Sequence, residues 1–239
     1  MKIAGQVAQI HPLFESTAQY FRVYLTEDAP DFSCTVTPDS LRFEQAELDE
    51  EARLEGFRFR TFTDPFLERA AIQRAFAEHL FDRDTLLFHG SAVALDGRGY
   101  LFTARSGTGK STHTRLWREV FGARATMIND DRPFLQLTDS GVLVCGNPWS
   151  GKHGLDSNVT LPLQGICILE RGLEDRIRPI SAEEALPMLQ KQTYCPLESE
   201  KYAAFLRLTE KLAQSIPLWR MECTKSPQAA QVAREAMGP

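Results

Sequence analysis

Hydrophobic residues follow two different spacings in the first third of the chain. Short apolar alternations between acidic and turn residues predict strands over residues 20–25, 32–36 and 56–62. From residue 64 to about 81, apolar residues recur on one helical face, and Asp64-Pro65 supply a good N-cap and first turn. We therefore predict a β-rich N-terminal extension, residues 1–85, that ends in a helix.

From residue 86 onward, short and mostly apolar runs indicate buried strands. These runs cover residues 86–88, 91–95, 100–103, 125–128, 134–137, 142–145 and 165–170. Turns at Asp96–Gly99 and Thr138–Gly141 join neighbours as hairpins, so the sheet should be mixed rather than purely parallel. In the C-terminal third, the pattern predicts helices before and after a last strand at residues 218–223. The predicted fold class is α/β, with a mixed sheet in a core domain over residues 86–239.

A glycine-rich loop joins the predicted strand ending at Thr103 to a predicted helix over 111–121. Its glycines allow the backbone to turn several N–H groups inward, and the following helix N-terminus attracts anions, so the loop is typical of phosphate-binding loops. Ala104 stands where the strict pattern has its first glycine; an ordinary glycine-rich turn is the alternative. The candidate nucleotide-binding residues are Arg105, Ser106, Gly107, Thr108, Gly109, Lys110, Ser111 and Thr112.

Two side chains of this loop have distinct expected tasks. Lys110 can reach the β- and γ-phosphates of a nucleotide, and the Ser111 hydroxyl can hold Mg²⁺. Downstream, Asp130 and Asp131 follow directly on a predicted strand and Asn129. A carboxylate at a strand end after a phosphate loop is where nucleotide enzymes hold Mg²⁺ or a base. Adjacent carboxylates point to different sides, so one can hold metal while the other faces an acceptor. A solvated acidic turn is the alternative.

His89 lies in Phe88-His-Gly90, at a break between two apolar strands. A lone histidine on a strand is commonly a buried structural residue. The neighbouring Gly90 permits close backbone approach, which favours a site. Both interpretations stay open from the sequence.

The polar loop over residues 147–158, here called the Trp149 loop, holds Lys152 and His153 between glycines. This cation and imidazole make a candidate substrate clamp. The loop follows the strand that leaves the Asp130-Asp131 hairpin, so we expect it at the same edge of the sheet. A surface loop anchored only by Trp149 packing is the alternative.

Three motifs, in order, resemble the catalytic core of bacterial HPr kinase/phosphorylase, which is similar to phosphoenolpyruvate carboxykinase. They are Phe88-His-Gly90, Ala104–Ser111 and Asn129-Asp-Asp-Arg132. The resemblance covers roughly residues 86–172 and rests on order and spacing as well as on the loop itself. Pro148–Gly154 resembles a group of short HPr-kinase-like proteins that includes kinases of lasso-peptide precursors.

This resemblance implies seryl kinase chemistry with ATP and Mg²⁺ on a carboxykinase-like nucleotide site. Asp130 would match the general base that takes the hydroxyl proton, and Asp131 its neighbour near the metal. His89 would match the histidine near the transferred phosphate. With Lys110, these give the expected catalytic set Asp130, His89 and Lys110, and the metal ligands Ser111 and Asp131. Ala104 departs from both parent families but leaves its backbone N–H available.

Composition and net charge limit the classes of binding partner that we expect. The 239 residues are 43% hydrophobic and 25% charged, as in globular proteins, and a net charge of −5 argues against nucleic acid. Five scattered cysteines without a C-x-x-C pair argue against a zinc site or a disulfide framework, and fit a reducing compartment. No apolar stretch approaches 18 residues, so no membrane partner is expected. We expect a cytoplasmic protein and leave homo-oligomerisation open.

The functional prediction is an ATP-dependent phosphotransferase that acts on a hydroxyl group, with a serine of a peptide or protein as the expected acceptor. A kinase of a small hydroxyl compound, such as free serine, is one alternative. A nucleotide-binding regulator or peptide-binding module without turnover is another. A regulator needs the loop and metal but no base, whereas a kinase needs Asp130.

Overall fold

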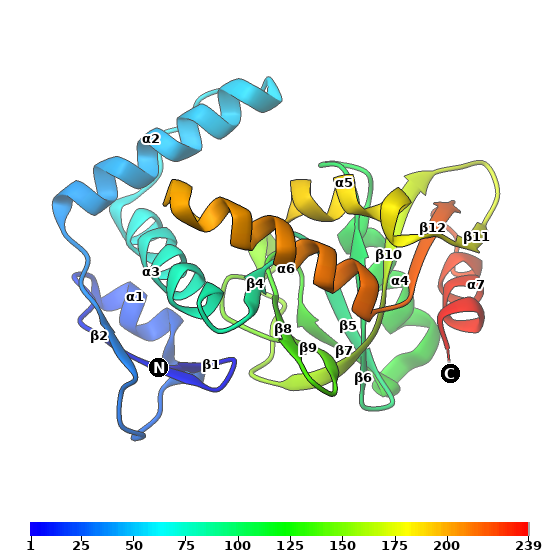
Figure 1. Ribbon diagram of the computed structural model, residues 1–239, viewed down its shortest axis with the longest axis horizontal. Helices are drawn as coiled ribbons and strands as arrows, with labels where there is room; N and C mark the ends of the chain where they lie inside the picture. The colour runs from blue at the N-terminus through cyan, green and yellow to red at the C-terminus, as the bar shows by residue number, and fades with distance from the viewer. Residues whose placement is uncertain (239) are drawn as a thin grey trace. The chain divides into compact units, whose positions relative to one another are not determined.

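The structure is a computed structural model that describes residues 1–238, except for the side chains of Glu55 and Lys152. The chain divides into two compact units, Met1–Leu80 and Phe81–Pro239 (Figure 1). The second unit is mixed α/β. Its strands are β4 (Thr85–Leu87), β5 (Ser91–Leu95), β6 (Arg98–Thr103), β7 (Ala125–Asn129), β8 (Phe134–Thr138), β9 (Gly141–Cys145), β10 (Thr160–Arg171), β11 (Arg176–Pro179) and β12 (Leu218–Cys223).

These strands form one sheet in the order β4-β8-β9-β10-β6-β5-β7, and β12 with β11 pairs onto β10 beside this path. The long strand β10 is parallel to β6 and to β12, and antiparallel to β9. The remaining pairs are all antiparallel, and two of them, β5–β6 and β8–β9, are hairpins, so the sheet is mixed, as its turn residues predict. The predicted strands of this unit are confirmed, and β11 is an addition that the sequence pattern did not indicate.

Helices cover both faces of the sheet (Figure 1). Strand β5 shows why: Ala92 and Ala94 point into a core shared with α5 and α6, whereas Val93 and Leu95 point into a core shared with α4 and α7. Both faces of the strand are therefore apolar. The helices are α4 (Lys110–Phe121), α5 (Ala182–Gln192), α6 (Tyr202–Ser215) and α7 (Gln228–Met237).

Local sequence signals set several element ends in this unit. Asp96 and Gly97 both have positive φ, 52° and 78°, as a tight hairpin turn between β5 and β6 requires. The Ser181 hydroxyl accepts a hydrogen bond from the Glu184 N–H and caps α5. Pro187 lies inside α5, which continues past it to Gln192.

The first unit contains more helix than strand. Its three short strands, β1 (Lys2–Ile3), β2 (Gln6–Ile10) and β3 (Phe32–Cys34), form a small sheet. Its helices are α1 (Glu15–Tyr20), α2 (Pro38–Glu55) and α3 (Asp64–Phe81), the last of which reaches the second unit. The strand over 32–36 and the helix over 64–81 are confirmed, but a β-rich extension is the wrong description.

Two predicted strands in this unit do not form. Residues 20–25 contain the end of α1 and a 3₁₀ turn at Arg22–Tyr24, because Phe21 and Tyr24, three residues apart, are both buried. Residues 56–62 alternate Phe and Arg, yet Phe57 and Phe59 are 58% and 66% exposed, and no strand pairs with them among the described residues. This alternation therefore does not reflect a half-buried strand.

The acidic stretch from Glu44 to Glu51, which separates two of the predicted strands, lies inside α2. Thr37 and Ser40 form a reciprocal capping box at the start of this helix, with Pro38 in its first turn. Glu44 is buried and pairs with Arg74, and the acidic residues after it lie on the more solvated part of this helix. Within residues 1–238 no helix is both long and apolar enough to cross a bilayer.

Candidate functional site

Three strand ends of the second unit meet at one edge of the sheet. Strand β5 begins at Ser91, and its antiparallel neighbours β6 and β7 end at Thr103 and Asn129. The Thr103 hydroxyl donates to the His89 carbonyl at 3.0 Å, and the Gly90 N–H donates to the Asp131 carbonyl at 2.9 Å. The topology therefore brings together the three motifs that are separated along the sequence.

The glycine loop, defined as Ala104–Gly109, leaves β6 and leads into α4. Gly107 and Gly109 have φ values of 73° and 126°, which favour glycine, and a Cβ on Gly107 would meet only open space. Gly109 is the N-cap of α4 and offers no side-chain cap. The first-turn N–H groups of this helix have no carbonyl one turn earlier in the helix, so the loop and helix start fit an oxyanion.

Ala104, the departure from the phosphate-loop pattern, has a structural explanation. Its side chain is fully buried in the core between the sheet and α4, where it joins Phe102 and Trp117. Its carbonyl accepts a hydrogen bond from the Lys110 ammonium at 3.4 Å. The methyl group therefore points away from the concave side of the loop, and the lysine lies across that loop.

The two adjacent carboxylates lie in different environments. Asp130 is 6% exposed, and its Oδ1 accepts a hydrogen bond from the Ser91 hydroxyl at 2.7 Å. The Asp131 carboxylate is half-buried, with Oδ1 3.5 Å from His89 Nε2 and Oδ2 3.9 Å from Arg132 Nε. One carboxylate is thus fixed in a buried position, while the other faces the more open side of the edge.

His89 has a strongly altered proton affinity. Burial, followed by the charges of Lys110 and Arg132, lowers its pKa to about 3. The imidazole is therefore neutral at pH 7, and its contact with Asp131 is not an ion pair. Lys110 and Arg132 lie near the ring together with the Asp131 carboxylate, so His89 has charges of both signs around it.

His113, on the buried face of α4, is a second neutral histidine. The Trp117 Nε1–H donates to its Nε2 at 3.2 Å, and burial lowers its pKa to about 4. The ring also packs against Phe102, with 4.5 Å between the ring centroids, so this position indicates a structural role for His113.

The pKa of His113 predicts a loss of stability in acid. An unfolded histidine takes up a proton near pH 6.5, whereas folded His113 resists until about pH 4, so the free energy of unfolding should fall as pH falls between these values. The full effect of this residue is about 3 kcal/mol. Urea denaturation from pH 8 to pH 4.5 should show a shallower pH slope for His113→Gln than for the wild type. Equal slopes would remove His113 as the cause.

The Asn129 side chain connects the carboxylate turn to the Trp149 loop. Its Nδ2 donates to the Asn147 carbonyl at 2.9 Å and to the Trp149 carbonyl at 3.3 Å. Its Oδ1 accepts from the N–H groups of Asp131 and Arg132 at 2.8 and 2.7 Å. The expected placement of this loop at the same sheet edge as the carboxylates is therefore confirmed.

The Trp149 loop also approaches Asp131 directly. Gly151 has a φ of 70°, and a Cβ on this residue would lie 3.1 Å from Asp131 Cβ. Trp149 itself is buried, so the loop is anchored by packing and still reaches the carboxylate. His153 is exposed, and the side chain of Lys152 lies outside the described part of the chain, so the expected contact of Lys152 with a substrate remains a prediction.

Arg171 is a neighbour of the glycine loop that the motifs did not indicate. Strand β10 is parallel to β6, with Ile168 opposite Thr103, so its last residues extend beyond the end of β6 toward the loop. The Arg171 guanidinium donates to the Gly107 carbonyl at 2.6 Å. Only the register of a strand some 60 residues away brings this cation to the loop, and no local signal could have found it.

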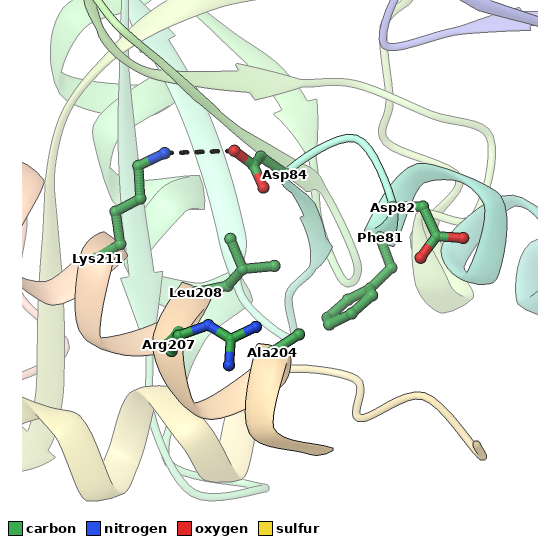
Figure 2. Close-up of a pocket in the computed structure, with 7 residues that line it drawn as sticks. All are labelled: Phe81, Asp82, Asp84, Ala204, Arg207, Leu208 and Lys211. Atoms are coloured by element: carbon green, nitrogen blue, oxygen red, sulfur yellow. Dashed lines mark hydrogen bonds and ion pairs between the residues drawn. The ribbon is translucent and has the colours of Figure 1, made fainter. Parts of the chain in front are cut away.

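A separate pocket of about 400 Å³ lies between α6 and the segment that leads into β4 (Figure 2). The Lys211 ammonium is 3.3 Å from the Asp84 carboxylate at its rim, and Arg207 and Leu208 line it from the helix. None of the residues predicted from the motifs lines this pocket.

Among residues 1–238 no cluster of three or more His, Cys, Asp or Glu side chains is arranged to hold a metal ion.

Comparisons with known proteins give a distant similarity. No protein-family model matches the chain, and no curated protein sequence matches it. Among solved structures, the HPr(Ser) kinase/phosphatase from Coxiella burnetii aligns with a TM-score of 0.38 and 11% identity, covering 63% of this chain and 95% of that chain. At this level of similarity, the functional assignment depends on the residues of the site.

Proposed function

We propose that this chain is an ATP-dependent phosphotransferase that phosphorylates a hydroxyl group, with a serine of a peptide or protein as acceptor. One observation carries the proposal: the glycine loop, Lys110 and a buried carboxylate, Asp130, meet at one edge of the sheet. The resemblance of the three motifs to HPr kinase/phosphorylase supports the same chemistry. A binding module without turnover would not require Asp130.

The glycine loop and α4 would bind the nucleotide phosphates. The N–H groups at the helix start point toward the loop, and Lys110 adds a cation that can move from the Ala104 carbonyl to a phosphate oxygen. The Ser111 hydroxyl and the Asp131 carboxylate supply hard oxygen ligands of the kind Mg²⁺ prefers. When bound, Mg²⁺ would neutralise charge on the phosphates and help to align them.

Asp130 would accept the proton of the acceptor hydroxyl. Its Oδ1 is occupied by Ser91, and within residues 1–238 no hydrogen bond is made by its Oδ2, which is therefore the oxygen available to a substrate. Three side chains would face the transferred group: the neutral imidazole of His89 and the cations Lys110 and Arg132. Their hydrogen-bond donors and the two positive charges would stabilise the phosphate oxygens. As the γ-phosphoryl group passes from ATP to the hydroxyl oxygen, the hydroxyl proton would move to Asp130 and ADP would be the leaving group.

The direct test is phosphate transfer from labelled ATP to a panel of serine-containing peptides, free serine and a cell extract, followed by mapping of the labelled atom. Label on a peptide or protein serine would support the proposal. Label only on a small alcohol would replace the acceptor class, and nucleotide binding without any transfer or hydrolysis would favour a regulatory module.

Gly151→Ala should lower transfer on the order of tenfold, because misplacing a reacting or metal-binding group by a fraction of an ångström has a large effect on rate. The new Cβ would lie 3.1 Å from Asp131 Cβ and 3.5 Å from its Cγ, so the carboxylate or the loop must shift. Steady-state transfer rates at saturating nucleotide measure this effect.

Gly154→Ala is the matched control for that substitution. Gly154 lies in the same loop and also has a left-handed φ, 58°, but a Cβ there meets no atom within 4 Å. Both variants therefore carry similar backbone strain, and only Gly151→Ala collides with Asp131. Equal losses in the two variants would mean that loop strain, and not the carboxylate, is responsible.

A further inference from the structure

A chain of buried hydroxyl groups connects α4 to Asp130. Ser91, at the start of β5, is fully buried, and Thr114, on α4, is 1% exposed. The Ser91 hydroxyl lies 2.8 Å from the Thr114 hydroxyl and 2.7 Å from Asp130 Oδ1. None of the three motifs includes Thr114, and nothing in the sequence pattern connects it to Ser91.

The direction of these hydrogen bonds follows from the chemistry of the groups. An ionised carboxylate only accepts, so Ser91 donates its single proton to Asp130. The Ser91 oxygen must then accept from Thr114 in the other contact. The alternative acceptors of the Thr114 proton, the Lys110 and Ser111 carbonyls, are farther away, at 3.4 and 3.3 Å. The chain therefore runs from Thr114 to Ser91 to Asp130.

We propose that Ser91 and Thr114 are positioning residues that hold the Asp130 carboxylate for proton transfer; this inference rests on the proposed function. A charge-assisted hydrogen bond to Oδ1 fixes the rotation of the carboxylate and leaves Oδ2 toward the acceptor. Thr114 lies one helical turn after Lys110. The chain thus couples the position of the proton acceptor to the helix that carries the phosphate-binding lysine.

The two residues should affect the rate of transfer far more than nucleotide affinity. Ser91→Ala should lower kcat roughly tenfold, since the carboxylate loses its only hydrogen bond among the described residues, with the affinity for a nonhydrolysable ATP analogue unchanged. Thr114→Val should lower kcat about threefold, because it removes the hydroxyl at nearly constant shape. Thr114→Ser, which keeps the hydroxyl, should retain most of the rate.

Combining the substitutions separates positioning from general packing. If Thr114 acts through Ser91, the double variant Ser91→Ala/Thr114→Val should be no slower than Ser91→Ala alone. Thr209→Val is the matched control, because Thr209 is also a fully buried helix threonine, bonded to the Phe205 carbonyl but located on α6. It should leave kcat unchanged. Multiplying losses in the double variant, or equal rates for Thr114→Val and Thr114→Ser, would overturn the proposal.

A measurement independent of activity tests the same contact. In thermal unfolding, the lowering of Tm by Ser91→Ala together with Asp130→Ala should be smaller than the sum of the single effects, because each substitution removes the one hydrogen bond that the two side chains share. Additive Tm changes would overturn the positioning role even in an active enzyme. If the Tm effects are coupled but the wild type transfers no phosphate to any acceptor, the proposed function fails and the hydrogen-bonded chain remains.

Discussion

Lys110→Ala should weaken the binding of Mg-ATP by a factor on the order of 10². Lys110 is the first residue of α4, directly after the glycine loop. Its ammonium already lies across the loop, 3.4 Å from the Ala104 carbonyl. A charge-assisted contact to a phosphate contributes roughly 1.5–3 kcal/mol, and each 1.4 kcal/mol is tenfold in affinity, so a loss on the order of 10²-fold is expected. Calorimetric titration with a nonhydrolysable ATP analogue measures it.

The fold should survive this substitution, since the side chain is only partly buried at the surface of the loop. Circular dichroism and Tm close to wild type would confirm that. Lys191→Ala, an exposed lysine at the end of α5, is the matched loss of one positive charge and should bind nucleotide as the wild type does. Undiminished affinity of Lys110→Ala would contradict the assignment of the phosphate loop.

The sheet of the second unit was predictable because its strands carry their own signals. Strand β5 is buried at every position, is apolar from Ala92 to Leu95 and is followed by Asp96-Gly97, and the apolar run and the turn residues are local features. A strand that is buried on both faces and ends in a tight turn has few alternatives. Strand β11, by contrast, has alternating exposed arginines and forms only through its pairing with β12.

The first unit was less predictable because long-range contacts override its local pattern. The side chain of Gln45, on α2, donates to the Arg60 carbonyl at 2.9 Å and accepts from the Phe62 N–H at 3.0 Å. A helix side chain thus occupies main-chain groups that a neighbouring strand would otherwise use. The alternation over residues 56–62 contains no information about Gln45, so the sequence pattern alone predicts a strand there.

Motif order brought His89, Lys110 and Asp130 into one hypothesis, and the strand topology brings their segments to one edge. The hydrogen bonds that hold these site residues in place could not be predicted from the sequence. Asn129 bonds across 18 residues to Asn147, and Ser91 across 39 residues to Asp130. Such contacts depend on register and packing, which no spacing rule encodes. The chemical roles of the site residues stay predictions that the experiments decide.

Asp130→Asn should keep nucleotide affinity and lose transfer by roughly 10²-fold or more, the usual contribution of a positioned base. The amide oxygen can still accept the hydrogen bond from Ser91 that the carboxylate Oδ1 accepts, so the buried side chain keeps its place in the fold. What the variant loses is the ability to take a proton. Single-turnover transfer with saturating labelled ATP measures the loss.

A surface carboxylate provides the control for that loss. Asp139→Asn removes the same charge from the exposed turn between β8 and β9 and should leave both affinity and transfer unchanged. If Asp130→Asn binds nucleotide normally but transfers phosphate near the wild-type rate, Asp130 is a structural residue that orders Ser91, and another group must take the proton. Because the two variants differ only in where one negative charge is lost, a selective effect at Asp130 would assign the proton transfer to the buried carboxylate.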